Sequence, residues 1–155
     1  MPLNPLTLAD GIREFTDPDF AGFTGLPQNT QDVGIKWAKA FKKYMIEIAN
    51  PPPGAGTIAG HSAGESAMAS TMSGIITPLP PTGLIAIQAG ALAYVLAFSA
   101  TTAPFISIPP PVPLILPPTP PTPAPIATIQ MATIIDLWVR TGLSSVPPAP
   151  PIPWL

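Results

Sequence analysis

Clusters of proline divide this chain into short segments and limit which of them can be helical. Proline accounts for 26 of the 155 residues, and the clusters lie at residues 51–53, 78–81, 104–125 and 147–153. Proline cannot continue an α-helix because it lacks a backbone N–H and its ring collides with the preceding turn. Each helix must therefore fit between two clusters, so the sequence predicts several helices joined by extended connections.

Charged residues are scarce, and nearly all of them lie in the first 65 positions. They form 9% of the chain, whereas about 25% is usual in soluble domains. No Asp, Glu, Lys or Arg occurs between residues 66 and 135. A segment of this kind is poorly soluble when it faces water, so it must form a core, lie in a membrane or contact other protein chains. The net charge of −2 provides no basic surface for nucleic acid, and no nucleic-acid partner is expected.

Four segments have the patterns expected of helices. Residues 29–49 begin with Asn29 as a possible N-cap and carry apolar residues three and four apart. Residues 63–76 are rich in small side chains, residues 83–100 are apolar on all sides, and residues 126–142 again show amphipathic spacing. The predicted fold class is mainly α, with about four helices, long proline-rich extended arms and little or no sheet.

The helix predicted over residues 29–49 has two distinct faces. Its apolar stripe consists of Val33, Trp37, Phe41, Tyr44, Met45 and Ile48. Its other face carries Lys36, Lys39, Lys42 and Lys43. We interpret the lysines as a solvated face. The alternative is a patch that binds an anionic membrane or nucleic acid, and the overall negative charge of the chain makes this alternative less favourable.

The remaining segments are predicted to be extended and to contact neighbouring subunits. Residues 1–28 form an N-terminal arm, residues 104–125 a strap and residues 143–155 a tail, around a helical core within residues 29–103. Half of the 22 residues of the strap are proline, which favours polyproline II, but apolar side chains are interleaved with them. We therefore expect the strap to lie on an apolar surface. The predicted interface residues are Phe105, Ile106, Ile108, Val112, Leu114, Ile115, Leu116, Ile152, Trp154 and Leu155.

One short motif resembles the nucleophile motif of serine hydrolases. Residues 60–64 match Gly-x-Ser-x-Gly with Ser62 at the centre, a motif that requires a strand–turn–helix bend and a histidine base from later in the chain. The single histidine, His61, lies inside the motif. Ser62 and Glu65 also match a capping box, so we interpret Ser62 as the cap of the helix predicted over residues 63–76. No enzymatic activity is expected.

The sequence predicts neither a metal site nor a cofactor. One histidine, no cysteine and eight scattered carboxylates provide no ligand cluster. Several Pro-x-x-Pro sequences occur, including residues 110–113, but no basic residue flanks them as signalling ligands would require. Packing within an assembly is therefore the preferred role of the proline tracts.

A membrane role is the main alternative for the apolar helix predicted over residues 83–100. Its 18 residues reach the lower limit for crossing a bilayer. No charged residue flanks either end to fix an orientation. We therefore predict a helix buried in protein, and keep as the alternative a small membrane-embedded or membrane-associated subunit.

The order of these parts resembles small virion proteins encoded among the structural genes of tailed bacteriophages. The resemblance is carried by the amphipathic helix with Trp37 and Tyr44, the Asn-Pro-Pro-Pro-Gly-Ala-Gly sequence of residues 50–56, and the Ile-Asp-Leu-Trp-Val-Arg-Thr-Gly sequence of residues 135–142 before a proline-rich tail. It implies a structural part of the virion, at the tail, neck or baseplate rather than the capsid. The implied partners are other structural proteins and further copies of this chain, without a catalytic residue or cofactor.

Overall fold

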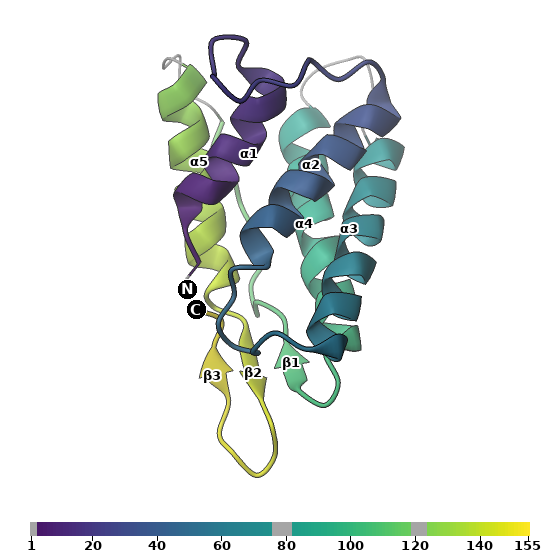
Figure 1. Cartoon of the computed structure of the whole chain (residues 1–155), viewed down its shortest axis with the longest axis vertical. Coiled ribbons are helices and arrows are strands. Elements are labelled where there is room, and N and C mark those ends of the chain that lie inside the picture. Colours follow the sequence, from purple (N-terminus) through teal and green to yellow (C-terminus); the bar gives the residue numbers. More distant parts are fainter. Residues whose placement is uncertain (1–2, 76–81, 119–123) are drawn as a thin grey trace.

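The computed structural model of this chain describes residues 3–75, 82–118 and 124–155, and these residues form a mainly helical fold (Figure 1). The prediction of a mainly helical fold is confirmed. Within the described residues there are five helices and one small sheet. The helices are α1 (Pro5–Thr16), α2 (Thr30–Met45), α3 (Ala55–Ile75), α4 (Thr82–Thr101) and α5 (Ala124–Val139), and the strands are β1 (Ile106–Ile108), β2 (Leu143–Ser145) and β3 (Ile152–Pro153).

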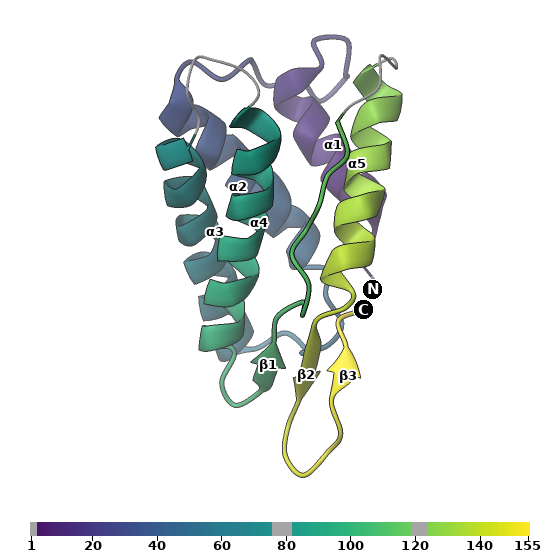
Figure 2. The same ribbon diagram turned by 180° about the vertical axis from the view of Figure 1, so that it is seen from behind.

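The helices follow one another around a single apolar core in the order α5, α1, α2, α3, α4. Each helix packs on the next in that order, and α4 and α5 are separated by the extended chain after β1 (Figure 2). The predicted strap is described over residues 104–118, of which 106–108 form β1, and we use the name strap below for residues 109–118. The core residues of all five helices and of the strap form one cluster. The strap therefore takes the place that a sixth helix would occupy.

Helix α2 confirms the predicted apolar stripe. Its side chains Trp37, Phe41, Tyr44 and Met45 are buried, as is Ile48 just beyond the helix end. The ring of Phe41 lies 4.9 Å from the ring of Tyr94 on α4, which places α2 against the centre of the core. The helix ends at Met45 rather than at residue 49, and the chain continues in tight turns in which the backbone N–H groups of Glu47 and Ile48 donate to the carbonyl oxygens of Tyr44 and Met45.

Helix α1 replaces the extended N-terminal arm predicted for residues 1–28, and that prediction is wrong over residues 5–16. The side chain of Asn4 accepts a hydrogen bond from the backbone N–H of Leu6, and Pro5 occupies the first turn, where its missing N–H removes no intrahelical bond. Leu8, Ile12 and Phe15 then lie on one buried face. The early prolines therefore begin this helix instead of preventing it.

Helix α3 begins eight residues before the start predicted from the capping box. The hydroxyl group of Thr57 accepts a hydrogen bond of 2.7 Å from the backbone N–H of Gly54, and this contact caps the first turn. Ser62 consequently lies inside the helix and is exposed, so its predicted role as a cap is wrong. The helix does not begin at the capping box because the residues before the box pack closely on α4 as part of the same helix.

That close packing depends on glycines four residues apart on α3. A Cβ atom at Gly60 would lie 2.9 Å from the ring of Phe98, and one at Gly64 would lie 2.8 Å from the ring of Tyr94. Such distances are too short for packed atoms, so only glycine lets α4 approach this closely. Gly60 and Gly64 thus face α4.

Replacing Gly64 by alanine tests this close approach. We expect Gly64→Ala to lower the free energy of unfolding by about 1–3 kcal/mol, because the added methyl group overlaps a ring in a filled core. Gly74→Ala, on the same helix, is the matched control, since its Cβ meets no described atom within 4 Å. It should instead stabilise the protein by about 0.5–1 kcal/mol through the lower backbone entropy of alanine in the unfolded chain. Chemical denaturation measures both, and equal effects would contradict the packing argument.

The sheet is small and lies at one end of the helices. Its order is β1-β2-β3 and both pairs are antiparallel, with Ser107 opposite Ser144 and Ser144 opposite Ile152. The hydroxyl groups of Thr102, Ser107 and Ser144 lie 2.7 Å apart in succession, so side chains connect the end of α4 to β1 and β2. The sheet is as small as predicted, but two of its three strands lie in the predicted C-terminal tail.

Candidate functional site

The strap lies between α4 and α5 and is held there by two side-chain hydrogen bonds. Gln88 Nε2 on α4 donates to the carbonyl oxygen of Leu114 at 3.0 Å. Trp138 Nε1 on α5 donates to the carbonyl oxygen of Val112 at 2.7 Å. Extended proline-rich chain has no internal hydrogen bonds, so these donors satisfy carbonyls that helix or sheet would otherwise satisfy.

The side chains of the strap divide between the core and the surface. Leu114 and Leu116 are buried under the helices, whereas Ile115 between them is 73% exposed. Val112 is also exposed. The strap thus belongs to the core of its own chain along one side and presents apolar side chains to the outside along the other.

The structure separates the predicted interface residues into two groups. Leu114, Leu116 and Trp154 are buried within their own chain, so these three residues stabilise the fold and are not available to a partner. Phe105 is half-buried, and the others are exposed. The exposed predicted interface residues are Ile106, Ile108, Val112, Ile115, Ile152 and Leu155.

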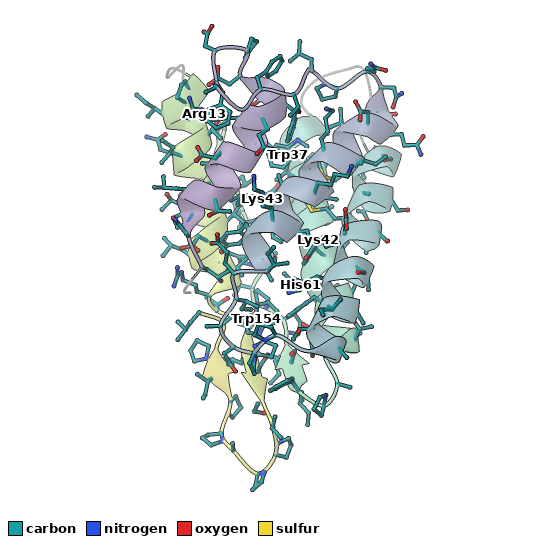
Figure 3. The ribbon with its side chains drawn as sticks, in the orientation of Figure 1. Arg13, Trp37, Lys42, Lys43, His61 and Trp154 are labelled. Carbon is teal, nitrogen blue, oxygen red and sulfur yellow. The ribbon has the colours of Figure 1, made fainter. Side chains whose placement is uncertain are left out.

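Trp154 was predicted as an anchor on a neighbouring subunit, but its side chain has no exposed surface in its own chain. Its ring meets the ring of Phe98 edge-on at 5.4 Å, and its Nε1 atom donates to the Ser144 hydroxyl oxygen at 2.8 Å. The backbone N–H of Ala49 donates to the carbonyl oxygen of Leu155. The end of the chain therefore returns to its own core, and Figure 3 shows Trp154 between the helices and the small sheet.

Truncating Trp154 should destabilise the fold. We expect Trp154→Ala to lower the free energy of unfolding by about 3–5 kcal/mol, because a fully buried indole leaves a large cavity. The neighbouring Leu155→Ala is the control: its side chain is 44% exposed, and its effect should stay within about 0.5 kcal/mol. Denaturation curves followed by circular dichroism measure both variants. A Trp154→Ala protein as stable as the parent would show that the tail does not pack in this way.

The outer surface of α4, the strap and α5 carries no charged residue, and we call it the uncharged face. Its large exposed apolar side chains are Ile85, Leu96, Val112, Ile115, Ile126, Ile129 and Leu137. Asp136 and Arg140 are the only charged residues after Glu65, and both point away from this face. Asp136 accepts hydrogen bonds from the Tyr44 hydroxyl group at 2.7 Å and from Arg140 Nε at 2.8 Å, and Arg140 also donates to the carbonyl oxygen of Leu3.

The buried contact with Asp136 changes the acid–base properties of its partners. Burial, and then the hydrogen bond to Asp136, raise the pKa of Tyr44 well above its usual value. The same carboxylate raises the pKa of Arg140 by a hydrogen bond. The charges of Asp136 and Arg140 are therefore used in contacts that connect α5 to α2 and to the N-terminal segment.

The opposite surface, formed by α1 and α2, carries most of the charge (Figure 3). Lys42 Nζ lies 2.6 Å from a Glu65 carboxylate oxygen, and Lys43 Nζ lies 2.7 Å from a Glu14 carboxylate oxygen. Pairing with carboxylates leaves little net positive field on this side, as expected of a solvated face. The molecule thus has one charged side and one uncharged side.

A groove on the uncharged face runs between the end of the strap and α5. It has a volume of about 600 Å³, and its apolar lining includes Leu84, Leu116, Met131 and Ile134. Ile129 and Gln130 of α5 also border it. The face therefore combines a concave apolar region with the projecting side chain of Ile115 beside it.

The Gly-x-Ser-x-Gly sequence forms no nucleophile site in the structure. Residues 60–64 lie within α3, so the strand–turn–helix bend that would raise Ser62 is missing from this part of the described chain. His61 is buried and its Nδ1 atom lies 3.0 Å from the Tyr94 hydroxyl oxygen, while its ring stacks on Phe98. Among the described residues, no group of three or more His, Asp or Glu side chains is placed to hold a metal ion.

Burial, and then the nearby positive charge of Lys42, lower the pKa of His61 to about 4. The protein should therefore lose stability as the pH falls from about 6.5, the ordinary pKa of histidine, to about 4. Over that range the unfolded chain binds a proton at His61 and the folded chain does not. The loss should reach about 3 kcal/mol, at about 1.4 kcal/mol per unit of pKa difference.

The variant His61→Gln isolates this effect, because the chain has no other histidine. Carboxylates titrate in both proteins, so the difference between their stability–pH curves reports His61 alone. We expect the parent to lose stability more steeply than the variant between pH 6.5 and pH 4. Parallel curves would contradict a buried neutral imidazole.

Comparison with protein-family models, curated proteins and solved structures finds no match to this chain. Within the described residues, one helical segment, Gly83–Thr101, is long and apolar enough to cross a membrane. In the structure one side of it packs on α3 and the strap, where Tyr94, Val95 and Phe98 are buried. Its other side belongs to the uncharged face.

Proposed function

We propose that this chain is a structural component of a large protein assembly, and that the assembly is a tailed-phage virion. The observation that carries the proposal is the uncharged face, which leaves large apolar side chains in solvent over two helices and the strap. A contiguous apolar surface of this kind on a folded domain is typical of a surface that another molecule covers. The tail, neck or baseplate is preferred to the capsid on the resemblance of the sequence alone.

The proline-rich segments contribute to subunit contacts through their outer parts. The strap presents Val112 and Ile115, and the loop of residues 146–151 between β2 and β3 projects from the end of the molecule (Figures 1 and 2). This loop is rich in proline and carries the exposed side chain of Val146. Preset backbone angles reduce the entropy that such segments lose on docking. We propose no catalytic activity, cofactor or nucleic-acid partner.

A membrane-embedded or membrane-associated subunit is the second candidate, because Gly83–Thr101 has the length and composition of a spanning helix. The strap weighs against it. In the described part of the chain, neither the backbone N–H nor the carbonyl oxygen of Ile115 has a hydrogen-bond partner, and the residue lies in the middle of the apolar face. Hydrocarbon leaves such groups unsatisfied at a cost of several kcal/mol each. A covering protein supplies partners.

Purified particles test the proposal directly. We expect mass spectrometry of density-purified virions from the host culture to contain this chain in a fixed ratio to the other structural proteins. Ile115→Asp, supplied in place of the parent chain, should enter particles less well. Ile58→Asp is the matched control, since Ile58 is 66% exposed on α3, outside the uncharged face. Recovery of the parent chain in host membranes and not in particles would overturn the proposal in favour of the membrane candidate.

A further inference from the structure

We infer that the uncharged face binds the same face of a second copy of this chain, and that the two straps meet at Ile115. This inference rests on the proposed function and names the partner that covers the face. It concerns the described surface of α4, the strap and α5.

The charge distribution restricts the occupant. The face has no ion to pair with a charged partner, and burying a partner's charge against it would leave that charge unpaired, which is costly. The occupant must therefore present an apolar surface of similar extent with no charge on it. In this molecule the charged side chains lie on α1, α2, the turns that follow these two helices and the middle of α3, or are paired at Asp136. A second copy of the uncharged face therefore meets this condition.

The size of the face is sufficient for a stable dimer. With 20 residues in α4 and 16 in α5, and the strap between them, its projected area is roughly 700 Å² from standard helix and strand dimensions. A specific interface buries about 800 Å² on each partner. The estimate lies within the range of specific interfaces, which bury about 600–1,000 Å² on each partner.

The shape of the face favours its own copy over an unrelated flat surface. A projecting side chain, Ile115 with 73% of its surface exposed, stands beside a groove lined by Leu116, Met131 and Ile134. In a two-fold dimer each contact occurs twice, so the two Ile115 side chains meet beside the axis and the groove of each copy receives apolar side chains of the other. The contact closes after two copies because each face is then fully used.

The backbone at Ile115 also favours a second copy of the strap as the partner. Its N–H and carbonyl groups have no partner within the described chain, and covering this residue with a purely apolar surface would leave both unsatisfied. An antiparallel encounter of two straps about a two-fold axis brings an identical donor and acceptor to each other. The peptide group that is unsuitable for lipid is therefore suited to a second strap.

The purified full chain in buffer without detergent tests the inference. Sedimentation equilibrium should show a dimer in the parent protein. Ile115→Asp should weaken dimerisation by about tenfold or more, because it buries a charge at the centre of the contact. Ile58→Asp should leave it unchanged. Circular dichroism checks that both variants remain folded, which is expected because both positions are exposed in the structure.

A cysteine variant locates the axis without changing the charge. The chain has no cysteine, so Ile115→Cys introduces a single thiol, and two such thiols beside the axis should form an intermolecular disulfide under mild oxidation. Ile58→Cys should not crosslink. A parent protein that stays monomeric, a dimer that Ile115→Asp leaves intact, or a dimer without crosslinking at position 115 would each overturn the inference.

These outcomes separate the inference from the proposed function. A monomer in buffer that still enters virions would remove the second copy as the partner and leave the structural role in place. Vesicles of neutral phosphatidylcholine, with and without anionic lipid, provide the last comparison. Binding to them in place of dimerisation would identify lipid as the occupant and overturn both.

Discussion

Closure of the helical arrangement by the strap is the interaction on which the rest of this structure depends. Helices α4 and α5 do not pack on each other, so the core between them is covered only where the strap passes. An extended, proline-rich segment can do this only if its carbonyl groups find donors, and Gln88 and Trp138 supply them from the two flanking helices. Without these donors, Leu114 and Leu116 could not be buried at an acceptable cost.

The spacing of apolar residues along the chain predicted α2 and α4 well. The stripe on α2 and the all-apolar pattern of α4 identified both helices, and the bounds of α4 differ from the prediction by one residue at each end. The start of α3 was missed because a capping box is a local pattern, whereas its real start depends on glycines that face α4. Helix α1 lies in a segment that was predicted to be extended, because a proline in the first turn of a helix, such as Pro5, looks the same in the sequence as a proline that prevents one.

The destination of the extended segments could not be predicted in the same way. Alternating proline and apolar residues indicate a segment that lies on an apolar surface, but they do not say whether that surface belongs to the same chain. Trp154 shows the difference, since it was expected on a neighbour and is buried beside Phe98. One signal for the strap was present: Gln88 is a half-buried amide in a largely apolar helix, and its N–H groups need a hydrogen-bond acceptor on that side.

The surface area shows that the unusual feature of this protein is the chemistry of its surface and not its shape. Its accessible surface is 7803 Å², close to the value of about 7,400 Å² for a compact monomer of this mass. The prolines have therefore not produced long arms, and one side of an ordinary compact molecule is left without charge. Because the strap completes the core with its inner side and exposes Ile115 on its outer side, a partner that binds the outer side also holds the inner side in place. Binding of the folded state alone stabilises it by mass action. In the proposed dimer, folding and assembly are thus coupled through the strap, because the extended segment that closes the core is also the one that the second copy covers.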